Sequence, residues 1–410
     1  MLLNAMRNTL NARRNMKYII IVPDGMSDYP LEVLSGKTPL AAAQTPHMDA
    51  LAKEGVLGRT RTVPDGFSPA SDVANLALLG YDPATYYCGR GPLEAAYMEV
   101  PYGPQDVVFR CNLITEAEGN LVDYCASHIS TAEAAVIMQE LNRRFADDPV
   151  QFYTGTSYRH IMIYRNGKTE ELEKVSCTPP HDIIGKNYKK HLPAGKNAAA
   201  LIEKMERSKS FLGELEVNKV RVDLKENPAN MIWLWGQGTR PDMEPFKEKF
   251  GKAGAVISAV NLIKGIGKLV GLKVLEVPGA TGYYDTNYQG KAEAAIEALK
   301  EVDFVFIHIE APDEAGHNQD VRMKILSIER IDKMIVGPIV EKMKGRDYRL
   351  LITPDHPTPI SLRTHTSDPV PFLLYGKGVK PGSFNAYDEF EVQRSSFFVD
   401  KGYKLIEMFF

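Results

Sequence analysis

The segment FVFIHIEAPDEAGH, residues 304–317, joins an apolar, strand-like run to two residues that commonly bind metal ions. The continuous apolar run is typical of a parallel strand that is buried on both faces. Asp313 and His317 are four positions apart, so a helical turn there would place both side chains on one face. The segment therefore predicts a core strand that ends next to candidate metal ligands.

Four further segments supply similar residues. LLITPDH (350–356) and RTHTSDP (363–369) contain Asp355, His356 and His365, KYIIIVPDG (17–25) contains Asp24, and PASDVAN (69–75) contains Ser71. Mixed carboxylate and imidazole ligands suit Mn²⁺, Zn²⁺ or Mg²⁺. If they gather at one sheet edge, they would form a two-metal phosphoryl-transfer site with a serine nucleophile.

Distance along the chain does not argue against a shared site, because parallel strands align their carboxyl ends and ligands bind beyond those ends. Taken alone, an Asp after a strand is more often a helix cap or an Asx turn. The joint pattern of three Asp and three His residues at or near strand ends favours a metal site. Adjacent Asp355 and His356 diverge in regular structure, so they would share an ion only from an irregular turn.

Short apolar runs alternate with helical patterns, which predicts an α/β fold with a mostly parallel sheet and helices on both faces. In residues 106–227, apolar and polar residues alternate more openly, which predicts a smaller α+β domain with an antiparallel sheet. We expect this substrate domain or lid to be inserted into a metal-binding core of residues 17–105 and 228–410. The expected core strands are Lys17–Val22, Met231–Trp235, Gly254–Val260, Lys273–Val277, Val302–Ile309, Tyr348–Thr353 and Val370–Tyr375.

Ser71 lies between a loop and a helix-like run, where an N-cap is the ordinary role of a serine. The two roles are compatible, because a helix N-terminus also stabilises phosphate. Coordination to a divalent cation would favour the serine alkoxide. No GxxxxGK[ST] loop or GxSxG elbow occurs, which argues against a P-loop kinase and a serine esterase.

The bulk composition is that of an ordinary globular protein of 410 residues, with 44% hydrophobic and 25% charged residues. A formal net charge of −3 gives no field that would attract nucleic acid or an anionic membrane. We expect residues 1–16 to be a disordered extension, with a transit peptide as the weaker alternative. The four cysteines form no CxxC pair, which favours free thiols in a cytoplasmic protein.

Together these residues resemble the alkaline phosphatase superfamily, and more closely the archaeal-type cofactor-independent phosphoglycerate mutases. The resemblance covers nearly all the chain after Met16. The motifs that carry it are KYIIIVPDGMSD, GKTPLAAAQTPHMDALAKEG, PASDVANLALLGYDP, GRGPLEAAYMEV, WLWGQG, KGIGKLVG, APDEAGH, TPDHPTP and THTSDPVPF.

The resemblance implies two divalent metal ions, with Mn²⁺ first and Mg²⁺, Zn²⁺ or Co²⁺ as alternatives. It assigns Asp313, His317 and His365 to one ion and Asp24, Ser71, Asp355 and His356 to the other. It also implies a ping-pong reaction of glycolysis and gluconeogenesis. Ser71 would take the phosphoryl group of 3-phosphoglycerate and return it to the 2-hydroxyl of the bound glycerate.

Expected substrate contacts are His128 as an acid or base, Arg159 for carboxylate or phosphate, and Lys264 for phosphate. Arg90 and Arg240 are further candidates, although each is more often a surface or structural arginine. The bacterial mutases have an arginine-rich segment where this chain has WLWGQGTRP, so the source of carboxylate recognition is open.

Three other functions remain open at this point. A homoserine kinase-like phosphotransferase would use the same core with another acceptor, and a phosphatase or phosphodiesterase would resolve the phosphoserine with water. A metal-stabilised binding module would have lost its chemistry, yet every candidate position holds a competent residue. The partner in the favoured hypothesis is a small phosphorylated metabolite, and the sequence does not indicate the oligomeric state.

Overall fold

The computed structural model describes residues 16–410, and these divide into two compact units. The first contains the described residues up to Tyr87 together with Met243–Phe410, and the second is Cys88–Asp242. The expected extension at residues 1–16 lies outside the described residues except for Met16. Within residues 16–410, no helix is both long and apolar enough to span a membrane.

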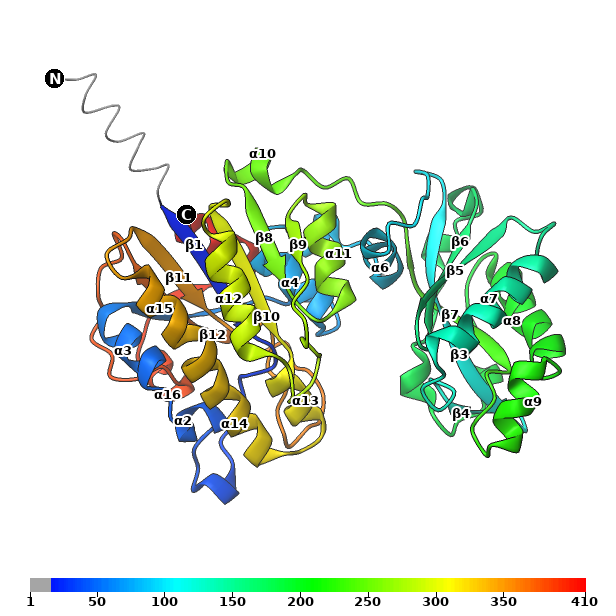
Figure 1. Cartoon of the computed structure of the whole chain (residues 1–410), viewed down its shortest axis with the longest axis horizontal. Coiled ribbons are helices and arrows are strands. Elements are labelled where there is room, and N and C mark those ends of the chain that lie inside the picture. Colours follow the sequence, from blue (N-terminus) through cyan, green and yellow to red (C-terminus); the bar gives the residue numbers. More distant parts are fainter. Residues whose placement is uncertain (1–15) are drawn as a thin grey trace. The chain divides into compact units, whose positions relative to one another are not determined.

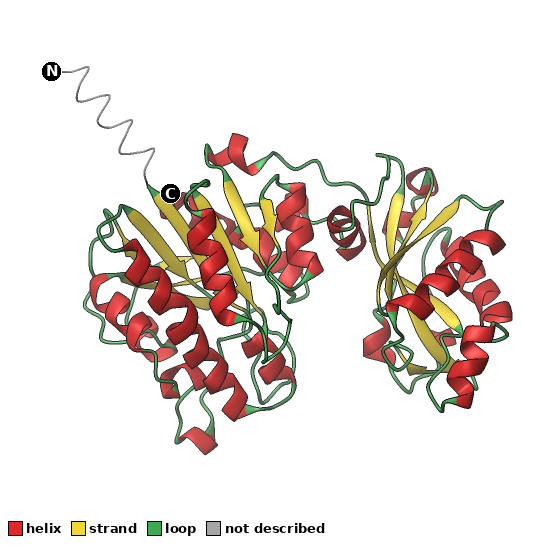
Figure 2. Ribbon diagram, viewed as in Figure 1, coloured by secondary structure: helices red, strands yellow, loops and turns green. Residues whose placement is uncertain are grey.

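The first unit is built on an eight-stranded sheet in the order β13-β2-β12-β11-β1-β10-β8-β9. Neighbouring strands run parallel except at β12, which is antiparallel to both β11 and β2 (Figures 1 and 2). The strands are β1 (Lys17–Pro23), β2 (Val56–Thr60), β8 (Gly254–Ile257), β9 (Lys273–Leu275), β10 (Phe304–Ile309), β11 (Tyr348–Ile352), β12 (Val370–Gly376) and β13 (Phe398–Val399).

Helices cover both faces of this sheet, which confirms the predicted α/β fold. On one face, Ile19 and Ile21 of β1 pack with Ala292 and Ala295 of α12 (Tyr288–Ala298). The helical stretch α14 (Val321–Ile331) to α15 (Gly337–Met343) lies on the same face. On the other face, α11 (Asn261–Leu269) brings Gly267 against Val256. Alternate strand residues therefore point into two separate cores, which explains the continuous apolar runs.

The second unit is built on an antiparallel sheet in which β4, β3, β6 and β5 are successive neighbours. β7 also pairs with β3, outside this order. Its strands are β3 (Val107–Ala117), β4 (Asn120–Asp123), β5 (Val150–Thr156), β6 (Arg159–Tyr164) and β7 (Met231–Gly238). Helices α7 (Thr131–Arg144), α8 (Ala198–Leu212) and α9 (Glu216–Asp223) belong to the same unit.

Two sequence predictions about this division are wrong. The strand expected at Met231–Trp235 exists as β7, but it pairs with β3 in the second unit and not with the core sheet. The boundaries also differ from 106 and 227, because α6 (Arg90–Tyr97) packs Ala95 against Val108 and Ile163 of the second unit. A buried apolar strand shows the same pattern in either sheet, so periodicity alone could not assign β7.

Candidate metal centre

The predicted metal ligands of the first unit gather at the carboxyl ends of three adjacent strands. β1 lies between β10 and β11, and its residue Pro23 is level with Ile309. Asp24 directly follows β1, and Asp355 follows β11 by three residues. Asp313 and His317 lie on α13 (Ala311–His317), which begins directly after β10 and Glu310. The strand register thus brings together residues that are hundreds of positions apart.

Asp313, His317 and His365 form one set of donors. His317 Nε2 lies 3.2 Å from Asp313 Oδ2, and His365 Nε2 lies 3.4 Å from Asp313 Oδ1. The two Nε2 atoms are 2.9 Å apart, whereas each Nδ1 atom faces a main-chain carbonyl, at Arg363 and Pro69 respectively. Hydrogen bonding through Nδ1 would leave both Nε2 lone pairs facing one point, the usual arrangement of histidines that bind a metal.

Asp24, Asp355, His356 and Ser71, which the resemblance assigns to the second ion, lie beside this set. His356 Nε2 lies 3.5 Å from both Asp24 Oδ1 and Asp355 Oδ2, and 3.1 Å from Ser71 Oγ. Asp355 and His356 sit in a bend, and the main-chain N–H of His356 donates to Asp355 Oδ1 over 2.9 Å. This bend is the irregular turn that was expected if the adjacent Asp355 and His356 share one ion. Among the described residues, the buried Asp24 Oδ1 has no hydrogen-bond partner.

The chain between the ligands is closely packed. Gly25 directly follows Asp24 and has a φ of 62°, and a Cβ there would lie 2.6 Å from both Asp313 Oδ1 and Thr358 Oγ1. Only glycine combines this conformation with such a close approach.

Ser71 is the first residue of α4 (Ser71–Leu78), and Ala70 holds the N-cap position. The Ser71 hydroxyl therefore does not cap the helix, which was the ordinary alternative to a functional role. Asn75 on the next turn donates through Nδ2 to the Ser71 carbonyl oxygen and to Asp355 Oδ2. Asn75 thus links the start of α4 to the Asp355 carboxylate.

His308 is a site residue that the sequence analysis missed. It lies within β10, opposite Val22 in the parallel register, and is 1% exposed. Its Nε2 atom is 3.1 Å from Asp24 Oδ2 and has no hydrogen-bond partner in the described part of the chain. Asp24, His308 and Asp355 form a second group that could hold a metal ion, and Asp24, Asp313 and His356 form another that overlaps with both. In the sequence, the sign of this site residue was a single histidine inside an apolar, strand-like run. The structure shows that this strand pairs with β1, which Asp24 directly follows.

Burial and crowding shift the ionisation of these groups. Burial, with repulsion from Asp355 and Asp313, raises the pKa of Asp24 well above its usual range. Burial lowers the pKa of His308 to about 4 and also lowers the pKa of His356. Burial opposes charge on His317 as well, but the Asp313 carboxylate outweighs it and raises the pKa to about 9. A divalent cation would relieve the repulsion among the Asp24, Asp355 and Asp313 carboxylates. It would also bind Asp24 Oδ1 and His308 Nε2, which have no hydrogen-bond partner in the described part of the chain, so the residues fit a metal site.

The predicted substrate contacts of the second unit partly gather around two aromatic rings. The Arg90 and Arg110 guanidinium groups lie 5.6 and 4.5 Å from the Trp235 ring centre, and the Arg159 guanidinium lies 5.2 Å from that of Tyr158. Burial and the charges of Arg90 and Arg159 lower the pKa of Arg110, despite its 3.3 Å ion pair with Glu94. We call Arg90, Arg110 and Arg159 the arginine cluster.

His128 lies at the side of this cluster, with its ring centre 6.0 Å from that of Tyr158. Arg110 was not predicted, because an arginine inside the apolar strand β3 gives no separate motif. Two further candidates have other interactions within their own units. Lys264 Nζ is ion-paired with Glu276 over 2.6 Å, and Arg240 is an exposed residue whose charge acts on Tyr102.

A parallel sheet edge that carries overlapping sets of carboxylate and imidazole donors is typical of a metal-dependent enzyme. Comparison with known proteins agrees, because residues 16–401 match the model of the Metalloenzyme superfamily. A curated relative from Methanothrix thermoacetophila is 49% identical over 96% of this chain and 99% of its own length. A second from Methanosarcina mazei is 51% identical over 95% and 98%. Both are named 2,3-bisphosphoglycerate-independent phosphoglycerate mutase.

Solved structures are similar over the same extent. A protein from Pyrococcus horikoshii superposes with a TM-score of 0.82 at 29% identity, over 96% of both chains. The cofactor-independent phosphoglycerate mutase of Thermoplasma acidophilum gives a TM-score of 0.65 at 25% identity, over 96% of this chain and 98% of its own. The chain belongs to the 2,3-bisphosphoglycerate-independent phosphoglycerate mutases, within the Metalloenzyme superfamily.

Proposed function

We propose that this protein interconverts 3-phosphoglycerate and 2-phosphoglycerate through a phosphoserine on Ser71. The observation that carries the proposal is the Ser71 hydroxyl, 3.1 Å from His356 Nε2, an atom that also lies 3.5 Å from carboxylate oxygens of Asp24 and Asp355. The names of relatives about half identical over nearly the whole chain support the same substrate.

Two divalent ions are part of this proposal. Asp313, His317 and His365 would hold one ion, and Asp24, Ser71, Asp355 and His356 the other, with Mn²⁺ as the first candidate over Mg²⁺, Zn²⁺ and Co²⁺. When bound, such ions favour a serine alkoxide and neutralise charge on a transferring phosphoryl group.

The chain's own residues then account for the two halves of the reaction. The Ser71 hydroxyl loses its proton as Oγ forms a bond to the phosphorus of 3-phosphoglycerate, the bond to the 3-oxygen breaks, and that oxygen takes a proton in exchange. Glycerate turns while bound, and its 2-hydroxyl loses a proton and attacks the phosphoserine. The Ser71 oxygen leaves, and 2-phosphoglycerate is released with the serine restored. His128 is the proposed group that accepts and returns the glycerate proton.

The arginine cluster is the proposed binding site for the glycerate carboxylate. A guanidinium fork matches the planar geometry of a carboxylate, and Arg159 is the exposed member of the cluster whereas Arg110 is ion-paired with Glu94. In this proposal the first unit is the metal-binding catalytic core and the second unit selects the substrate. Lys264, which is ion-paired with Glu276, stays a candidate for a phosphate contact, and Arg240 stays a further candidate. A glycolytic substrate supports a place in the cytoplasm.

A coupled enolase assay without added 2,3-bisphosphoglycerate tests this function. We expect turnover of 3-phosphoglycerate with Mn²⁺ and none after chelation. A parallel assay with ATP and homoserine is the control for another acceptor. Phosphohomoserine formation with no mutase activity would overturn the proposal, and so would release of inorganic phosphate as the main product.

A further inference from the structure

A buried ion pair lies behind the candidate metal centre and takes no part in the proposed reaction. Lys324 on α14 is 0% exposed, and its Nζ atom donates to Asp28 Oδ2 over 2.7 Å and to the Thr358 carbonyl oxygen over 2.8 Å. Burying both charges has a large desolvation cost. The pair therefore requires a structural or functional reason.

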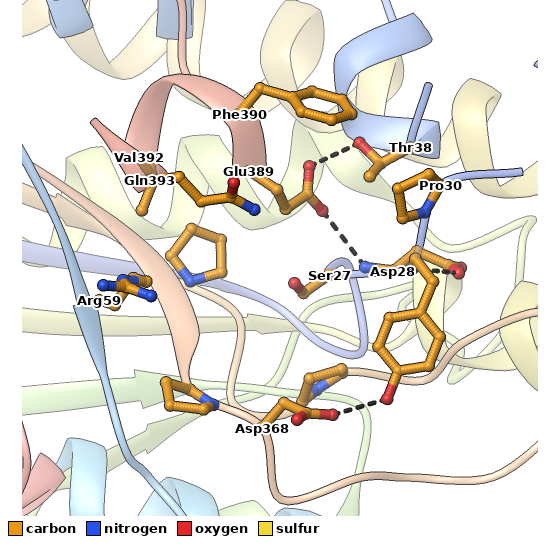
Figure 3. Close-up of a pocket in the computed structure, with 14 residues that line it drawn as sticks. Ser27, Asp28, Pro30, Thr38, Arg59, Asp368, Glu389, Phe390, Val392 and Gln393 are labelled. Carbon is orange, nitrogen blue, oxygen red and sulfur yellow. Dashed lines mark hydrogen bonds between the residues drawn. The ribbon is translucent and has the colours of Figure 1, made fainter. Parts of the chain in front are cut away.

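Asp28 is held from a second direction. It lines a cavity of about 280 Å³, together with Thr38, Arg59 and Glu389. Figure 3 shows the Glu389 carboxylate between Thr38 and Asp28, where it accepts from Thr38 Oγ1 over 2.6 Å and from the Asp28 main-chain N–H over 3.2 Å. The backbone of Asp28 is thus fixed on the cavity side, while its carboxylate faces Lys324.

The same ion pair fixes the loop that follows Asp355 and His356. Asp28 accepts from the Ile360 main-chain N–H over 3.2 Å, while Lys324 binds the carbonyl of Thr358 two residues earlier. Both ends of this short segment are therefore attached to one buried pair. Thr358 has little freedom to move relative to α14.

Thr358 in turn contacts the metal-ligand candidates. Its Oγ1 atom donates to Asp313 Oδ1 and lies 3.3 Å from His356 Nδ1. Asp313 and His356 belong to different donor sets in the proposed assignment. One hydroxyl thus contacts a ligand of each set.

We infer that Thr358 is a positioning residue for Asp313, and that the Lys324–Asp28 ion pair holds Thr358 in place. This inference rests on the proposed metal centre. Carboxylates that bind metals are commonly hydrogen-bonded by a second layer of residues, and loss of such a bond typically costs roughly 10–100-fold in metal affinity. Without the Thr358 hydrogen bond, the Asp313 carboxylate would rotate more freely away from His317 and His365.

Titration of Mn²⁺ into the chelator-treated full-length protein, followed by calorimetry, tests the inference. For Thr358→Val we expect one Mn²⁺ site to weaken roughly 10–100-fold, with an unfolding midpoint in EDTA close to that of the unchanged protein. Thr358→Ser keeps the hydroxyl and should restore the affinity. The matched control is Thr115→Val. It also removes a buried threonine hydroxyl, but one that lies in the second unit and donates to a main-chain carbonyl, so Mn²⁺ affinity should not change.

A second variant tests the ion pair itself. Lys324→Met should weaken Mn²⁺ binding, whereas Lys204→Met should only lower stability, because Lys204 is a buried lysine paired with Asp148 in the second unit. Unchanged Mn²⁺ affinity in both Thr358→Val and Lys324→Met would overturn the inference. Absence of Mn²⁺ binding to the unchanged protein would instead refute the proposed metal centre.

Discussion

Ser71 occupies a position where a weak nucleophile could become reactive. Its hydroxyl is not used as a helix cap, because Ala70 is the N-cap residue, and it faces His356 Nε2 at 3.1 Å. The N-terminus of a helix such as α4 favours an incoming phosphate through its main-chain N–H groups and its dipole. The serine thus combines a helix N-terminus with neighbouring metal-ligand candidates.

Replacing Ser71 by Ala should remove turnover and leave the fold in place. We expect the mutase rate to fall at least about 1000-fold, because the variant lacks the hydroxyl that is proposed to carry the phosphoryl group. The measurement is the coupled assay, with Mn²⁺ binding followed by calorimetry on the same sample. Activity equal to that of the unchanged protein would remove Ser71 from the mechanism.

Arg159 offers a test of the arginine cluster, because its side chain is exposed and its loss should not disturb packing. A charge-assisted hydrogen bond is worth about 1.5–3 kcal/mol, so Arg159→Ala should raise KM for 3-phosphoglycerate roughly 10–100-fold. Arg143→Ala on α7 is the matched control, since that arginine is exposed and pairs only with Glu140 among the described residues. A KM unchanged in Arg159→Ala would argue against a carboxylate contact.

The residues that the sequence predicted and those it missed differ in a physical way. Asp24, Asp313 and Asp355 follow apolar strands, so their position beyond a strand end could be expected from the pattern alone. His308 and Arg110 lie inside apolar strands. A polar residue in such a strand usually has a hydrogen-bond or ion-pair partner nearby and does not by itself indicate a functional site. Only the register of β10 against β1, and of β3 against β7, shows what they face.

At the scale of elements, the parallel register explains why the site forms. β1, β10 and β11 are neighbours, so the loops after them meet at one edge of the sheet. These strands could be predicted because each is a short apolar run bounded by polar residues. The sheet to which β7 belongs could not, because strand pairing depends on contacts between residues far apart in the chain.

Strand β6 carries a buried histidine whose effect on stability can be measured apart from the metal centre. His160 is 1% exposed, its Nδ1 accepts from the Gly155 N–H, and its Nε2 has no hydrogen-bond partner in the described region. Burial lowers the pKa of His160 from 6.5 to about 3. Between these values the unfolded chain binds a proton that the folded chain does not.

Stability of the second unit should therefore fall as the pH decreases from about 6.5 towards 3, at up to about 1.4 kcal/mol per pH unit from this residue. We expect His160→Asn, which keeps an acceptor for the Gly155 N–H, to reduce that slope. Chemical unfolding at about pH 7.5, 6 and 5 would measure how the free energy of unfolding depends on pH. Identical slopes in the two proteins would show that His160 is protonated without cost in the folded state.

At the scale of the whole molecule, the two tasks that we propose fall in different units. The donor sets belong to the unit built on the parallel sheet, and the arginine cluster belongs to the antiparallel unit. Metal binding should therefore stabilise the first unit specifically. Binding at 100 times the dissociation constant adds about 2.7 kcal/mol for each site.

Removing the metal tests this division directly. We expect EDTA to lower the unfolding midpoint of the full chain and Mn²⁺ to restore it, because bound ions relieve repulsion among the buried carboxylates. Asp313→Asn should reduce the gain from Mn²⁺. Equal midpoints with EDTA and with saturating Mn²⁺ would show that the donor sets do not bind this ion.

The central claim, transfer of the phosphoryl group through Ser71, is tested most directly by mass spectrometry of the protein quenched during turnover of 3-phosphoglycerate. The account predicts a phosphate on the peptide that contains Ser71, formed at a rate that supports turnover and absent from Ser71→Ala. A turning-over enzyme with no phosphate on Ser71, or with phosphate on another residue such as a histidine, would contradict it.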